Sequence, residues 1–408
     1  SSLEVPLQNV IEHFNQLTPS LYNLRRGSDN NLSFSQYDWE SIALHEVGHC
    51  IGMAHPNLAS ESGLSSPVND STKSTTGADS IYNTNSFTDG VYGSVDDIRG
   101  DDENLHWFIL GVNNPFTSPD VVDASNFARN LALLPSDDNF AANADRTVAG
   151  LFGVSGTEAV MQQLTYNDED QRSLVADEVN TLKFARTGLD RTHGTTDDYT
   201  VNLTYGGISS TDCDINVSFN NAETGFAVCQ TSGSFINSSN VRITSANVYM
   251  NSSAVTWHFS NNRVPAPVND VGTVANGGTM TTVNGGSASL IANDMHPLSA
   301  SLSLSTTTFG GADHGTVSLN ADGTFSYMHD GGASTSDSFV YRVCMTSDAN
   351  ACSFGRVDIE VVTTVYTIGG TVSGLEGSGL VLQNNSGDNL PISANGEFTF
   401  PTPVANAS

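Results

Sequence analysis

The chain carries at residues 45–55 the stretch His45-Glu46-Val47-Gly48-His49-Cys50-Ile51-Gly52-Met53-Ala54-His55. His45 and His49 are four residues apart, so on a helix their imidazoles share one face and can bind one metal ion. Glu46 stands beside them, where its carboxylate can reach a metal-bound water. Gly52 can adopt a positive φ and turn the chain, which would bring His55 round as a third nitrogen ligand. Three protein nitrogens and an open position predict a catalytic zinc, because a structural zinc is closed by a fourth protein ligand.

The residues before this stretch predict two helices. Val10, Ile11, Phe14 and Leu17 recur at helical spacing. A second helix is predicted from Ser35, as N-cap, to about Gly52, which is a natural helix terminator.

This eleven-residue pattern resembles the metzincin metallopeptidases, and the flanking Ser41-Ile42-Ala43-Leu44 looks most like the matrixin branch. Metzincins also have a tight turn that holds a methionine below the metal, and the stretch around Met161 resembles that turn. The resemblance implies an α+β catalytic domain with one Zn²⁺ and a protein or peptide substrate. It also implies a zinc-activated water as nucleophile, with Glu46 as general base.

The sequence departs from the family pattern in its spacing. Only 44 residues precede His45, so most of the twisted N-terminal sheet, whose edge strand lines the substrate cleft in the family, is expected to be missing. About a hundred residues separate His55 from Met161, which predicts a long insertion at about 56–156 within a catalytic domain of residues 1–190. The first and last residues suggest a processed or truncated piece of a longer protein.

Beyond residue 190 the pattern changes to short alternating stretches between Gly, Asn and Asp turns, which is typical of β-sandwich modules. A small β domain is predicted at 191–264. Residues 265–363 resemble the cadherin-like or immunoglobulin-like repeats of bacterial surface proteins, and residues 364–408 read as a truncated β repeat. The predicted fold class is therefore multidomain: an α+β metzincin-like catalytic domain followed by all-β sandwich modules.

The amino-acid composition argues against two classes of partner, nucleic acids and the membrane interior. The 14 Lys and Arg against 44 Asp and Glu give a formal net charge of −30, which argues against nucleic acid as a partner. No stretch approaches ~20 consecutive apolar residues, so we expect no membrane span in this chain.

Cysteine placement favours an oxidising setting, because two pairs are spaced for local disulfides, Cys213 with Cys229 and Cys344 with Cys352. The alternative is four unrelated buried thiols. Cys50, the fifth cysteine, is expected to be a small buried residue. A secreted or cell-surface location follows from the disulfides.

The densest acidic cluster contains Asp96, Asp97, Asp101 and Asp102. These carboxylates could bind Ca²⁺ through hard oxygen ligands. The cluster does not match an EF-hand loop, and a solvated helix start is the commoner explanation of such a pattern.

The sequence therefore favours a secreted zinc-dependent endopeptidase. The alternative from another class is a catalytically inactive surface adhesion or binding protein that retains a metzincin-like zinc site. A structural zinc within a binding module is a third reading, against which an open coordination position would argue.

Overall fold

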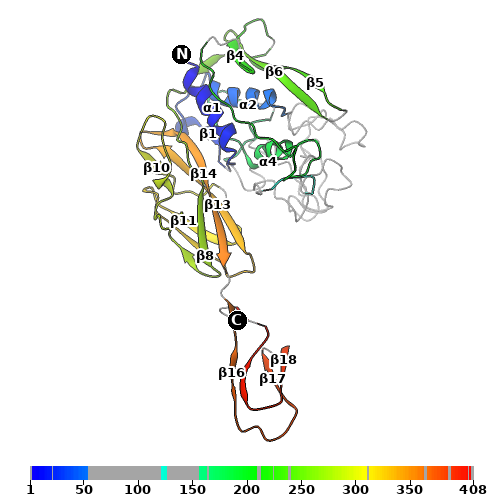
Figure 1. Ribbon diagram of the computed structural model, residues 1–408. Helices are drawn as coiled ribbons and strands as arrows, with labels where there is room; N and C mark the ends of the chain where they lie inside the picture. Colours follow the sequence, from blue (N-terminus) through cyan, green and yellow to red (C-terminus); the bar gives the residue numbers. More distant parts are fainter. Residues whose placement is uncertain are drawn as a thin grey trace, which may run out of the picture.

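The fold is multidomain and mostly β, and its described α-helices lie in the N-terminal part (Figure 1). It is seen in a computed structural model that describes residues 2–20, 22–53, 121–125, 156–162, 165–208, 213–223, 225–237, 240–309, 312–362, 365–384, 387–402 and 404–405.

Within the described residues, the N-terminal part contains three α-helices and several short strands. These are α1 (Glu4–Gln16), β1 (Leu24–Arg26), β2 (Gln36–Asp38), α2 (Trp39–Cys50), β3 (Glu169–Gln171) and α4 (Ala176–Ala185). Helix α1 buries Val10 and Phe14 against α2, as the helical spacing predicts. Helix α2 starts later than predicted, since its N-cap is Asp38 and not Ser35.

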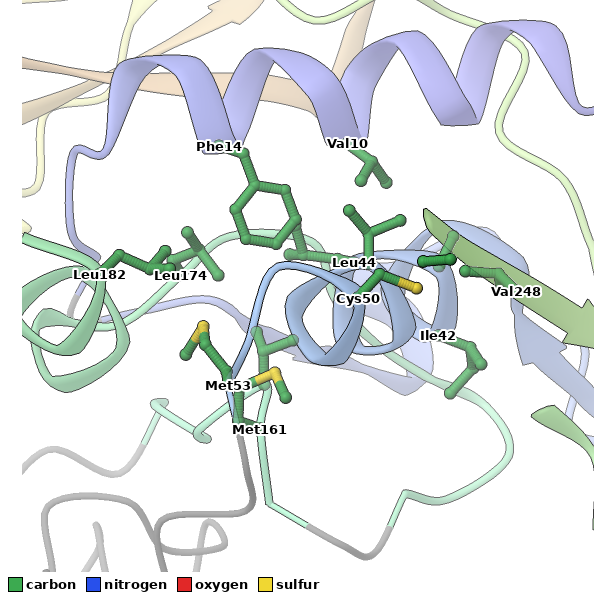
Figure 2. Packing of buried hydrophobic residues seen from close by; sticks show 14 of the residues in the cluster. Val10, Phe14, Ile42, Leu44, Cys50, Met53, Met161, Leu174, Leu182 and Val248 are labelled. Carbon is green, nitrogen blue, oxygen red and sulfur yellow. The ribbon is translucent and has the colours of Figure 1, made fainter. Parts of the chain in front are cut away.

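A three-stranded sheet covers the other side of α2. It contains β4 (Ile215–Phe219), β5 (Ala227–Phe235) and β6 (Val241–Met250) in the order β4-β6-β5, with β4 parallel and β5 antiparallel to β6. The next strand, β7 (Thr256–His258), pairs in parallel with β2. In Figure 2, Val248 of β6 approaches α2 from the side away from Leu174 and Leu182.

These strands correct the prediction of a separate small domain at 191–264. Ala246, Val248, Met250 and Trp257 share one hydrophobic core with the helices, which contains Val10, Phe14, Trp39, Leu44, Met161 and Val179. A sheet of three short strands needs a second layer to bury its apolar face, and α1 with α2 supplies that layer. The sheet that packs on α2 is therefore contributed by residues downstream of the histidines.

The next domain is a β-sandwich. One sheet has the order β10-β13-β14-β8 and the other β11-β12-β9. The strands are β8 (Asp270–Ala275), β9 (Thr279–Met280), β10 (Leu302–Leu304), β11 (Gly315–Leu319), β12 (Phe325–His329), β13 (Ser336–Met345) and β14 (Asp348–Val362). Its core includes the fully buried Leu290, Tyr327 and Val357.

The last described residues form paired short strands at the far end of the molecule (Figure 1). These are β15 (Val365–Tyr366) with β20 (Val404–Ala405), β16 (Gly369–Val372) with β19 (Gly396–Thr399), and β17 (Leu380–Asn384) with β18 (Gly387–Ile392). Among the described residues, no helix is both long and apolar enough to cross a membrane.

Candidate metal centre

Helix α2 is fixed at its start by a buried ion pair. The Asp38 carboxylate caps the helix by accepting from the Ser41 backbone N–H at 2.9 Å, and it also accepts from Nε and Nη2 of Arg172 at 2.9 and 2.7 Å. The Arg172 guanidinium holds the pKa of Asp38 below its usual range, although burial alone would raise it. A carboxylate at a helix N-terminus also suits the helix dipole.

The two histidines of α2 converge as predicted. Their Nε2 atoms lie 3.0 Å apart, and their rings meet edge to face. The Nδ1 atom of His45 lies 2.6 Å from the Val160 carbonyl oxygen, and that of His49 lies 2.8 Å from the Met53 carbonyl oxygen. A carbonyl only accepts, so when a metal ion occupies the site each Nδ1 would donate its proton to its carbonyl and each Nε2 would be the ligand atom.

This donor set fits a metal ion. Two imidazole nitrogens on a tetrahedral zinc, with Zn–N bonds of about 2.0–2.1 Å, lie roughly 3.3 Å apart, close to the spacing seen here. Backbone carbonyls that hold the Nδ1 protons are the usual second partners of zinc-binding histidines. Burial also lowers the pKa of His49, more than its bond to the Met53 carbonyl raises it, which favours the neutral form that binds metal.

Glu46, which follows His45 in the chain, is buried, with 6% of its surface exposed. Burial raises the pKa of its carboxyl to about 7, and a hydrogen bond from the Cys229 backbone opposes that rise. Its Oε2 atom has no hydrogen-bond partner within the part of the chain that the structure describes. A buried carboxyl oxygen is costly to leave unpaired, so this atom has unused capacity to accept a proton or a hydrogen bond.

Met161 packs against α2, next to Met53 (Figure 2). It is fully buried, and a Cβ at Gly48 would come within 2.5 Å of its sulfur, so the close approach depends on glycine. The turn is held by Glu178, whose carboxylate accepts from the Met161 N–H at 2.6 Å and the Val175 N–H at 2.8 Å. The turn therefore supplies both the carbonyl that orients His45 and the apolar floor below α2.

After α2 the chain turns back at Gly52, whose φ is +109°. The Met53 N–H donates to the Gly48 carbonyl at 3.0 Å, so the turn is closed by the helix itself. The predicted third ligand, His55, lies outside the described residues, as do Asp96, Asp97, Asp101 and Asp102 and nearly all of the 56–156 insertion. Among the described residues, no group of three or more His, Cys, Asp or Glu side chains is placed to hold a metal ion.

The disulfide pattern is partly corrected. Cys344 pairs with Cys352 as predicted, but Cys229 pairs with Cys50 and leaves Cys213 as a free thiol. The predicted Cys213–Cys229 pair is wrong because β6 separates β4 from β5, so the two strands lie about 9–10 Å apart, beyond the ~7 Å Cα limit for a disulfide. Cys50 is buried as expected, and it bonds to the sheet.

The sequence reading missed the contribution of β5 to the site. This strand forms the edge of its sheet, is exposed over its last six residues, and reaches Glu46 and Cys50 through Cys229. The alternation at 215–219 signalled a strand, but no local feature signalled which core it joins.

Comparison with known families identifies one part of the chain. Residues 262–360 match the family model described as a bacterial Ig domain, which covers the β8–β14 sandwich. No curated protein matches the chain. These findings establish an Ig-like β domain, and they carry no information about residues 1–261.

Solved structures give only distant likenesses. A nucleoside hydrolase-related hypothetical protein from Saccharophagus degradans is 17% identical, with 28% of this chain and 27% of that chain covered and a TM-score of 0.20. The protocadherin GammaB4 extracellular domain is 15% identical, covering 36% and 22%, with a TM-score of 0.19. Immunoglobulin domains 1–4 of Sidekick-1 are 9% identical, covering 40% and 52%, with a TM-score of 0.17. The chain thus spans about a quarter of the first two structures, and scores this low carry no argument.

Proposed function

We propose that this chain is a zinc-dependent endopeptidase of the metzincin type, most similar to matrixins, with His45, His49 and His55 as zinc ligands. The observation that carries the proposal is the pair of Nε2 atoms 3.0 Å apart, with each Nδ1 against a backbone carbonyl. That arrangement brings two ring nitrogens to one point at a spacing close to that of two ligands on one divalent metal ion.

Zinc, when bound, supplies a Lewis acid for the scissile carbonyl and acidifies a water molecule. The protein's part is proton transfer. Glu46 is adjacent to His45 in sequence, is buried, and has an Oε2 atom without a partner among the described residues. It accepts the proton of the attacking water and passes it to the leaving amine. Met161 binds nothing and fixes the floor of the site.

The β4-β6-β5 sheet favours the hypothesis that the substrate is an extended protein or peptide chain. Edge strand β5 offers backbone groups to which another extended chain can add. Because Cys229 of β5 is bonded to Cys50 of α2, a peptide on that edge would lie near the C-terminal turn of the helix that carries His49.

A secreted or cell-surface location is part of the proposal. Two disulfides indicate an oxidising compartment, and the bacterial Ig domain at 262–360 fits an extracellular protein.

Glu46→Gln tests the catalytic assignment. We expect the variant to keep its zinc but to cleave casein at least ~100-fold more slowly, because the amide cannot take a proton from water. Glu360→Gln, on the exposed end of β14, serves as the matched control and should cleave like the wild type. Zinc content by plasma mass spectrometry and casein cleavage should be measured together. A zinc-loaded Glu46→Gln protein with wild-type cleavage would refute the proposal.

The second candidate is a non-catalytic surface-binding protein that keeps the metal site, and the match of 262–360 to a bacterial Ig domain favours it. A zinc-loaded wild-type chain that cleaves neither casein nor a peptide library would select this candidate.

A further inference from the structure

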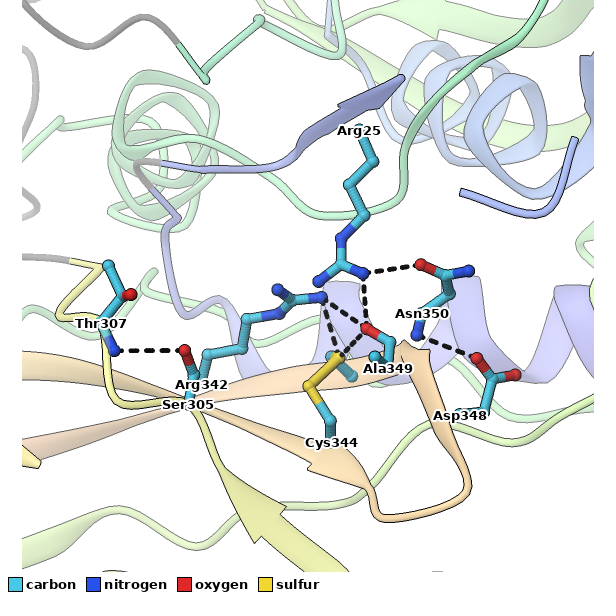
Figure 3. The surroundings of a disulfide bond; sticks show 9 residues. Arg25, Ser305, Thr307, Arg342, Cys344, Asp348, Ala349 and Asn350 are labelled. Atoms are coloured by element: carbon cyan, nitrogen blue, oxygen red, sulfur yellow. Dashed lines mark hydrogen bonds between the residues drawn. A yellow bond between two sulfur atoms is a disulfide. The ribbon is translucent and has the colours of Figure 1, made fainter. Parts of the chain in front are cut away.

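The Ig domain touches the N-terminal unit through a stiffened hairpin tip, defined as residues 344–352 (Figure 3). The Cys344–Cys352 disulfide closes the tip, and Arg342 Nη2 donates to the Ala349 carbonyl at 3.0 Å. From the N-terminal unit, Nη1 of Arg25 donates to the same carbonyl at 2.5 Å and to Asn350 Oδ1 at 2.6 Å. The tip is therefore a rigid acceptor for one arginine of β1.

A second contact lies close by in sequence. Phe309 of the Ig domain, only 5% exposed, meets the Tyr22 ring edge to face, with the ring centroids 5.5 Å apart. Phe309 is itself packed against Phe354. The Ig domain thus holds both ends of a four-residue segment, 22–25, that belongs to the N-terminal unit.

The same segment holds the turn below the histidines. The Leu24 N–H donates to the Gly156 carbonyl at 3.0 Å, and the Tyr22 ring would lie 2.7 Å from a Cβ at Gly156. Asn23, which is buried, brackets Glu158: its Nδ2 donates to the Glu158 carbonyl at 2.6 Å, and its Oδ1 accepts from the Glu158 N–H at 2.9 Å. Two residues further on, the Val160 carbonyl orients His45.

We propose that the Ig domain positions the metal site: Phe309 and the 344–352 tip clamp segment 22–25, which fixes the 156–161 turn and with it the ring of His45. The inference rests on the proposed zinc site. Phe309 and Asn350 are then positioning residues that touch neither metal nor substrate. A ligand whose orientation depends on a carbonyl loses affinity when that carbonyl can move, and outer partners of zinc ligands are known to act in this way.

Cobalt binding to the full-length chain tests this inference without any measurement of catalysis. Co²⁺ affinity is measured by competition with a chelator, and the visible d–d absorption of bound Co²⁺ reports the ligand geometry. We expect Phe309→Ala and Asn350→Ala to weaken Co²⁺ binding on the order of 3- to 10-fold and to change the absorption band. Asn350→Asp should restore the wild-type values, because its carboxylate can still accept from Arg25.

Asn276→Ala is the matched control. It removes a side-chain hydrogen bond to the Gly332 carbonyl, and Asn276 itself pairs with Val362, at the end of β14 away from the tip. We expect wild-type Co²⁺ binding from it. Equal weakening in Asn276→Ala, or wild-type affinity and spectrum in folded Phe309→Ala and Asn350→Ala proteins, would overturn the inference. A wild-type chain that binds no Co²⁺ would instead overturn the zinc site itself, and the inference with it.

Discussion

At the residue scale, the most consequential group outside the histidines is Glu40, in the first turn of α2. It is 1% exposed, and its Oε2 accepts from Asn9 Nδ2 at 3.0 Å and from the Ser260 hydroxyl. Burial raises the pKa of Glu40 to about 7, although Arg172 opposes the rise. The carboxyl therefore keeps its proton in the folded chain well above the pH at which it ionises in the unfolded chain.

This shift predicts a pH dependence of stability. Between the ordinary pKa of 4.5 and about 7, the folded chain binds more protons at Glu40 than the unfolded chain, so stability falls as pH rises. The full difference is roughly 3 kcal/mol. In Glu40→Gln that contribution is absent, so the drop in unfolding free energy from pH 5 to pH 8 should shrink.

Urea unfolding at both pH values measures this effect. Glu397→Gln, on the exposed strand β19, is the matched control and should show the wild-type drop. An equal drop in Glu40→Gln and wild type would show that Glu40 ionises normally in the fold.

The part of the candidate site that could be predicted from the sequence follows from the identity of a few residues and the short spacing between them. The i, i+4 relation of His45 and His49 follows from helix geometry alone, so it could be predicted without knowledge of the fold. The pairing of the cysteines depends on which strands are neighbours in the fold. Closeness in sequence predicted that Cys229 bonds to Cys213, whereas Cys229 bonds to Cys50, 179 residues away. Among the described residues, the Oε2 atom of Glu46 has no hydrogen-bond partner. This results from tertiary packing, which the spacing of residues in the sequence does not reveal.

At the scale of elements, the Cys50–Cys229 disulfide joins the last residue of α2 to edge strand β5. It lies one residue after His49, so it fixes the C-terminal turn of the helix that bears both imidazoles. The loop it closes spans 179 residues, for which chain entropy alone implies roughly 5 kcal/mol of stabilisation.

Cys229→Ser should therefore lower the free energy of unfolding by about 2–5 kcal/mol. Cys213→Ser, which removes a thiol outside any disulfide, should have little effect and is the control. Non-reducing peptide mapping checks the pairing directly. Recovery of Cys229 linked to Cys213 would contradict this account.

Element types were easier to predict than element partners. The apolar spacing at 10–17 predicted helix α1, because the periodicity of an amphipathic helix can be recognised within about a dozen residues. The cap and terminator signals at Ser35 and Gly52 predicted α2. The start of α2 was placed at Ser35, since a serine is a good cap, whereas Asp38 makes the stronger cap by also pairing with Arg172. Arg172 is 134 residues away, so no local pattern reveals it.

At the scale of the whole molecule, one core is assembled from three distant stretches of chain. Residues of α1 and α2, of the 160–182 region and of 246–257 all pack together. The alternation at 215–219 and 255–259 predicted strands correctly. The spacing of hydrophobic residues does not specify whether a sheet folds alone or against a pair of helices. That is why a separate β domain was expected where the structure has the second layer of the N-terminal unit.

Because α2 and the β4-β6-β5 sheet share one hydrophobic core, we expect them to unfold together. Val248 is fully buried on β6, so Val248→Ala should destabilise the common core by about 2 kcal/mol and speed amide exchange in α2 as well as β6, roughly 30-fold. Val357 is equally buried, but in the core of the Ig domain, so Val357→Ala should speed amide exchange mainly in β13 and β14. Hydrogen exchange with mass spectrometry separates these segments. Faster exchange in β4 to β6 with α2 unchanged would show two independent units.

The proposed function depends on three imidazoles that bind one zinc ion and leave a coordination position for a non-protein ligand. X-ray absorption at the zinc edge of the zinc-loaded full-length chain tests it most directly. We expect three histidine nitrogens and one further light atom around the zinc, all at about 2.0–2.1 Å. A sulfur scatterer at about 2.3 Å, a fourth histidine, or a chain that retains no zinc would contradict it.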